Sequence, residues 1–139
     1  MKSKIPLWVM IVGVLLAAIG LGIGIYGYAN PQEALKTINA GATANDVGIM
    51  VISARNIGMA TIMILALLSK VPRLIGLVFI MRFVTEAQDL IATISGSTNG
   101  IGGVWQSVIF IGLILFAEAL AIIKMNKMGN ELAQQQSKK

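Results

Sequence analysis

The chain has 139 residues, of which 56% are hydrophobic and 12% are charged, and its mean hydropathy is +0.81. This composition excludes an ordinary soluble domain, because too few polar residues remain to cover an apolar core. Cysteine and histidine are both absent, which excludes disulfides, thiolate metal sites, histidine-ligated haem and thiol or imidazole nucleophiles. The net charge of +5 is explained by membrane topology rather than by nucleic acid, since most basic residues flank apolar segments.

The first apolar segment covers about residues 6–28 and carries no charged residue. A helix rises about 1.5 Å per residue, so a segment of this length can cross a hydrocarbon core. The basic start before it also fits a signal peptide, but the apolar run is longer than that of a usual signal, so we expect a retained span. Its small residues predict close packing against another helix or docking against another subunit, and these are Gly13, Gly20, Gly24 and Gly27.

The polar connection after the first span predicts a short helix on the outer face. Asn30 can cap this helix, Pro31 suits its first position, and Glu33 has the spacing of a capping box. We expect the helix over about residues 31–40, closed at Gly41.

Three further apolar segments complete the predicted fold, and they cover about residues 48–68, 74–94 and 104–123. Pro72, in the basic turn before the third span, is placed to start a helix. The glycine-rich connection at 95–103 lacks the lysine of a phosphate loop and is predicted to be a turn. The polar residues after 123 predict a fraying tail. The sequence therefore predicts an all-α protein, in which residues 1–139 form a single domain, a four-helix transmembrane bundle.

The basic residues outside the predicted spans indicate the orientation. All but Lys36 fall on the side that holds both termini and the turn between the second and third spans: Lys2, Lys4, Lys70, Arg73, Lys124, Lys127, Lys138 and Lys139. By the positive-inside rule both termini are cytoplasmic, and we expect a multi-pass protein of a bacterial inner (cytoplasmic) membrane. Aromatic residues near the predicted boundaries agree with this, namely Trp8 at the inner one and Tyr26, Tyr28 and Trp105 at the outer one.

The charged residues inside the predicted spans are the candidate functional residues. Arg82, Glu86 and Asp89 are spaced i, i+4 and i+7, so they share one face of the third span. This face must point into the bundle because lipid cannot solvate it. The second and fourth spans add the other polar members of the set: Arg55, Asn56 and Glu118.

Counting residues from the outer helix ends sorts these charges into two layers. Arg55 lies roughly 10 Å deep, Glu86 about 12 Å and Asp89 about 8 Å, whereas Arg82 and Glu118 lie at roughly 18 and 21 Å. Arg55 can therefore pair with Glu86 or Asp89, and Arg82 can pair with Glu118. Three acids against two arginines leave one acid over, and Asp89 or Glu86 is the candidate.

Two interpretations of these charges remain open. They are internal salt bridges that decide which helices pack together, or they line a polar cavity, open toward the outer face, that binds the polar end of a lipophilic molecule or passes protons. The candidate ligand-binding residues are Arg55, Asn56, Arg82, Glu86, Asp89 and Glu118. Asp89 and Glu86 are also the candidate catalytic acids, and no metal site is expected.

About residues 30–92 resemble the DoxX-like small four-helix membrane proteins. The matching pieces are the outer-face helix, Ala54-Arg55-Asn56 with Gly58, the basic turn from Lys70 to Arg73, Gly76 and Asp89. The chain departs from the family at Asn56, where an acidic residue is usual, and in the extra charges of Arg82 and Glu86. The resemblance implies a four-helix membrane fold and an accessory or quinone-proximal role, because the named relative is a membrane subunit linked to thiosulfate and quinone oxidation.

The leading functional hypothesis is a membrane protein that binds a lipophilic molecule of quinone or isoprenoid type, or an accessory subunit of a membrane complex. The alternatives are a membrane-embedded isomerase or cyclase that uses a buried carboxylate, and a small proton-coupled transporter. We expect no intrinsic cofactor other than a bound quinone or lipid, since the chain has neither a haem or cluster ligand set nor a dinucleotide fingerprint. The expected partners are the lipid bilayer, a lipophilic small molecule, and other membrane subunits or further copies of the chain, but no nucleic acid.

Overall fold

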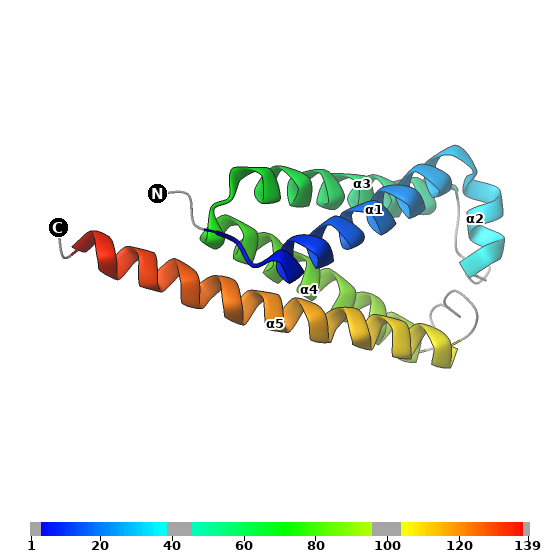
Figure 1. The fold of residues 1–139 in the computed structure, drawn as a ribbon. Coiled ribbons are helices and arrows are strands. Elements are labelled where there is room, and N and C mark those ends of the chain that lie inside the picture. The colour runs from blue at the N-terminus through cyan, green and yellow to red at the C-terminus, as the bar shows by residue number, and fades with distance from the viewer. Residues whose placement is uncertain (1–3, 39–45, 96–103, 138–139) are drawn as a thin grey trace.

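The computed structural model describes residues 4–38, 46–95 and 104–137, and every regular element within these ranges is an α-helix (Figure 1). The elements are α1 (Leu7–Ala29), α2 (Pro31–Ile38), α3 (Asp46–Ser69), α4 (Pro72–Ile94) and α5 (Val104–Ser137). The prediction of an all-α protein is confirmed for this part of the chain.

Three of these helices are long and apolar enough to cross a membrane: Leu7–Ala29, Val47–Ser69 and Val104–Ser137. Such a set is what a multi-pass integral membrane protein requires. α4 is also 23 residues long. It is not among these three, because Arg82, Glu86 and Asp89 lie along it.

The long helices are arranged as two antiparallel pairs, in which α1 packs along α3 and α4 packs along α5. The pairs meet mainly through α3 and α4, which Lys70 and Val71 connect. Lys70 adopts the left-handed φ of 54° that this tight turn requires. α2 lies across the far end of the α1/α3 pair (Figure 1).

Glycines of α1 bring the first pair close together. A Cβ added to Gly24 would lie 2.7 Å from Cγ1 of Ile57 and 2.9 Å from the carbonyl oxygen of Ser53, so no larger residue fits without movement. A Cβ on Gly20 would lie 3.4 Å from Cβ of Ala60. The packing prediction for these glycines is confirmed. The prediction that this face of α1 docks against another subunit is wrong, because α3 of the same chain covers the face.

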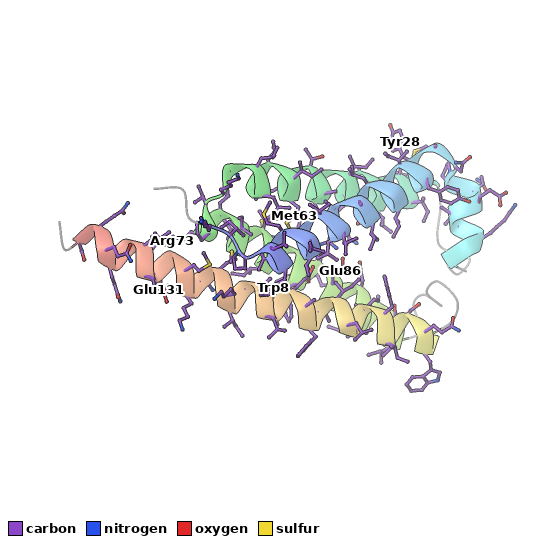
Figure 2. All side chains as sticks on the ribbon, viewed as in Figure 1. Trp8, Tyr28, Met63, Arg73, Glu86 and Glu131 are labelled. Atoms are coloured by element: carbon purple, nitrogen blue, oxygen red, sulfur yellow. The ribbon has the colours of Figure 1, made fainter. Side chains whose placement is uncertain are left out.

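The contiguous apolar core lies in one half of the molecule, and buried Ile49, near the start of α3, lies outside it. The side chains of this core come from the first half of α1, the second half of α3, the first half of α4 and the second half of α5, which are the halves near the α3–α4 turn. The fully buried members include Val9, Ala60, Met63, Ile75, Phe79, Ala121 and Met125. Figure 2 shows Met63 in this region. The candidate charged residues therefore begin where the apolar core ends.

α5 differs from its prediction, because the helix continues to Ser137 instead of ending near residue 123 in a fraying tail. Packing explains the difference. Met125 is fully buried and faces Gly76 of α4, and Gly129 is buried against Arg73, which lies beside this part of α5 in Figure 2. These contacts stabilise the polar turns, which hydropathy alone does not mark as ordered.

The helix boundaries elsewhere follow the predictions. α2 begins at Pro31, and its predicted end and Gly41 lie outside the described residues. Asn30 ends α1 and precedes α2, since its N–H donates to the carbonyl of Tyr26 and its own carbonyl accepts from Ala34. On α2, Nζ of Lys36 donates to Oε1 of Glu33 at 2.8 Å, which raises the pKa of Lys36.

Candidate functional site

Arg82 on α4 is the centre of the buried charges. Its Nε donates to Oε1 of Glu118 on α5 at 3.1 Å, and its Nη2 donates to Oε1 of Glu86, one turn further along α4, at 2.5 Å. Nη1 points toward α1, where it lies 3.6 Å from the position of a Cβ built on Gly20. One guanidinium thus serves two carboxylates and reaches the other helix pair. Glu86 is labelled in Figure 2.

Glu118 is the most deeply buried acid of this cluster. Its side chain has 0% exposure, compared with 7% for Arg82 and 19% for Glu86. Oε1 accepts from Arg82, but Oε2 has no hydrogen-bond partner among the residues that the structure describes. A buried carboxylate oxygen without a donor is costly, so this atom is the main unbalanced feature of the interior.

A second ion pair joins the two helix pairs further along α4. Nη2 of Arg55 on α3 donates to both carboxylate oxygens of Asp89, at 3.2 Å to Oδ1 and 2.9 Å to Oδ2. The side chains are 35% and 44% exposed. This pair is therefore accessible, in contrast to the cluster around Arg82.

The charged face of α4 runs from the buried Arg82 to the accessible Asp89. The exposed fraction of its side chains rises from 7% at Arg82 through 19% at Glu86 to 44% at Asp89. Thr93, one turn beyond Asp89, is buried again at 3% exposure, and its hydroxyl donates to the carbonyl of Asp89 at 2.9 Å. The helical spacing of these residues places them on one face of α4.

The expected pairing of Arg82 with Glu118 is present, and of the two acids expected for Arg55 the structure selects Asp89. The contact between Arg82 and Glu86 was not predicted, although their i, i+4 spacing is the signal that could have found it. Asn56 of α3 lies against Gly20 of α1. Its carbonyl oxygen would be 3.4 Å from a Cβ on Gly20, but within the described ranges its side chain joins none of these ion pairs.

The prediction that Asp89 or Glu86 is the unpaired acid is wrong. Asp89 is bound by Arg55, and Glu86 is bound by Arg82. The shortage of donors falls on Glu118, because it shares Arg82 with Glu86 and keeps one oxygen without a partner. Charge counting could not assign this shortage, since it depends on which guanidinium nitrogen faces which helix.

The two groups of charges suit different chemistry. The Arg82 cluster is buried and can hold helices together or hold a proton. The Arg55–Asp89 pair presents both a donor and an acceptor at an accessible position, so it can bind the polar end of another molecule. No protein-family model, curated protein or solved structure matches the chain, and the resemblance to the DoxX-like proteins stays a prediction.

Proposed function

We propose that this protein binds a lipophilic molecule of quinone or isoprenoid type, at the Arg55–Asp89 end of a four-span bundle in a bacterial inner membrane. The observation that carries the proposal is the accessibility of this ion pair, 35% and 44% exposed, beside an otherwise apolar set of helices. A charged pair at membrane depth is costly when it lacks polar surroundings, so a ligand's polar group would stabilise it.

The assignment of α4 as the fourth span rests on its length and its partners. Its 23 residues match those of α1, and it runs back along the bundle directly after α3. Ion pairs formed with α3 and α5 offset the cost of its charges. With four spans both termini lie on one side, and the positive-inside rule makes that side cytoplasmic because it holds Lys70, Arg73 and Lys124.

The chemistry of the pair favours a ligand that accepts hydrogen bonds. Within the described residues Arg55 uses only Nη2 toward Asp89, which leaves its other N–H donors for a quinone carbonyl or an isoprenoid phosphate. Asp89 can accept from a hydroxyl of the reduced quinone. The apolar tail would then lie in the bilayer along the exposed hydrophobic side chains that surround the pair.

Two probes test this function directly, a short-chain ubiquinone and farnesyl phosphate. We expect one of them to raise the melting temperature of the parent protein in detergent, and Arg55→Gln and Asp89→Asn to abolish the rise. The matched control is Lys36→Gln, which breaks the exposed Glu33–Lys36 pair on α2 and should keep the full response. An equal response in all variants, or none in the parent with either probe, would contradict the proposal.

An accessory role in a membrane complex is the second candidate, and the length of α5 favours it. The helix continues through polar residues to Ser137, past the start of α4 (Figure 1). This extension offers a partner a preformed helical surface. A photo-crosslinker at Gln134 should then yield one defined adduct in cells, and the same crosslinker at Lys36 should not, whereas no adduct at Gln134 would argue against this role.

A further inference from the structure

The buried charges around Arg82 do not balance. Arg82 faces two carboxylates, Glu86 and Glu118, so ionisation of both acids leaves the cluster with one negative charge in excess. The second arginine of the spans cannot correct this, because Arg55 is held by Asp89. The surplus lies in the least accessible part of the site, where Glu118 has 0% exposure.

No other charged group on the neighbouring helices offsets the surplus. α1 carries no charged residue, and its ionisable Tyr26 and Tyr28 are exposed near its end. On α3, the residue next to Arg55 is Asn56, whose side chain carries no charge. On α5 the nearest basic residue, Lys124, is six positions from Glu118, roughly 9 Å along the helix, and it is exposed. No side chain of the described residues therefore supplies the missing positive charge of the cluster.

A proton is the cation that fits the space and the ligands. A bound metal ion needs several oxygen ligands, and no group of three or more acidic, cysteine or histidine side chains in the described part of the chain could hold one. A proton needs a single oxygen. Oε2 of Glu118 is such an atom, since it is buried and lacks a donor while Oε1 is held by Arg82.

We propose that Glu118 holds a proton on Oε2, so that the cluster consists of a neutral carboxylic acid beside a balanced Arg82–Glu86 ion pair. The split follows from the geometry. Glu86 has the shorter contact with Arg82, 2.5 Å against 3.1 Å, and is the more exposed acid, so it is the better site for the negative charge. A neutral hydroxyl is also much less costly in this interior than an unpaired anionic oxygen.

The position of the cluster gives this proton a one-sided path. Toward the α3–α4 turn, the apolar core closes the interior with Phe79, Ala121 and Met125. In the other direction the acids of α4 become steadily more exposed, from Glu86 to Asp89. The proton on Glu118 therefore exchanges by way of Glu86 with the exposed surface at Asp89, and not through the apolar core. This inference does not depend on binding of a lipophilic ligand.

Infrared spectroscopy tests the proposal, because a protonated carboxyl has a C=O band that a carboxylate lacks. The parent protein at pH 7 should show this band, and Glu118→Gln should remove it. Glu86→Gln should also remove it, although Glu118 is still present, because the loss of Glu86 lets Arg82 neutralise an ionised Glu118. Glu33→Gln, on exposed α2, and Asp89→Asn should both leave it unchanged.

Other outcomes overturn the proposal. Absence of the band in the parent means that both acids are ionised, and a band that survives Glu86→Gln means that simple burial, not shared charge, retains the proton. A band that disappears when sodium replaces potassium in the buffer means that a metal ion competes for the site. Should Glu118→Gln fail to fold, Glu118→Asp replaces it, and a shift of the band in that variant assigns it to this position.

Discussion

Gly20 of α1 and Arg82 of α4 meet where the two helix pairs come together. A Cβ on Gly20 would lie 3.6 Å from Nη1 of Arg82 and 3.4 Å from the carbonyl oxygen of Asn56. The absent side chain leaves room for a guanidinium that binds acids on two helices. The glycine face of α1 therefore serves both the packing of α3 and the placement of the central charge.

Substitution by alanine should change the stability of the protein in opposite directions at Gly22 and Gly24, which lie two positions apart on α1. Gly24→Ala places a Cβ 2.7 Å from Ile57, so we expect a loss of about 1–3 kcal/mol in the free energy of unfolding. A Cβ on Gly22 meets nothing within 4 Å, and Gly22→Ala should stabilise by about 0.5–1 kcal/mol because alanine favours the helix. Reversible unfolding in detergent measures both. Equal effects would show that α1 does not pack closely on α3.

Removal of Arg82 should be the most damaging single change in the charged cluster. Arg82→Met leaves Glu86 and Glu118 without a cation, and we expect a loss of about 3–5 kcal/mol, as for other broken buried pairs. The triple variant Arg82→Met, Glu86→Gln, Glu118→Gln should recover much of this loss, because it leaves no unpaired charge. A triple variant as unstable as the single one would mean that Arg82 stabilises the protein by the packing of its side chain and not by its charge.

The accessible ion pair should contribute much less to stability. Because Arg55 and Asp89 are partly exposed, we expect Asp89→Asn to cost about 1 kcal/mol. Thermal unfolding beside Arg82→Met gives the comparison under one condition. A loss of stability as large as that of the Arg82 variant would indicate that this pair is structural and would weaken its assignment as a ligand site.

The end of α5 should behave as ordered helix outside the membrane. Met125 and Gly129 pack against α4, so we expect slow amide hydrogen exchange over residues 125–132 and faster exchange over 133–137. Gly129→Pro should remove the protection around it, because proline deletes a helical hydrogen bond and clashes with the preceding turn. Fast exchange from residue 124 onward in the parent would instead support a fraying tail.

The positions of the long helices could be read from the sequence because they depend on local properties. Uncharged runs of sufficient length, Pro72 at a helix start and the spacing of Arg82, Glu86 and Asp89 act within one segment, whatever its neighbours are. The pairing of Arg82 with Glu118 also followed from the sequence, since antiparallel helices bring residues of equal depth together, whereas counted depth left Arg55 between Glu86 and Asp89.

Only the tertiary structure decided how these parts share their contacts. It assigned the partnerless oxygen to Glu118 instead of Glu86 or Asp89, covered the α1 glycines with α3, and extended α5 to Ser137. Each of these depends on side chains from different helices that approach within a few ångströms of one another. Hydropathy and spacing describe one helix at a time, so they determine which face turns inward but not which atoms meet there.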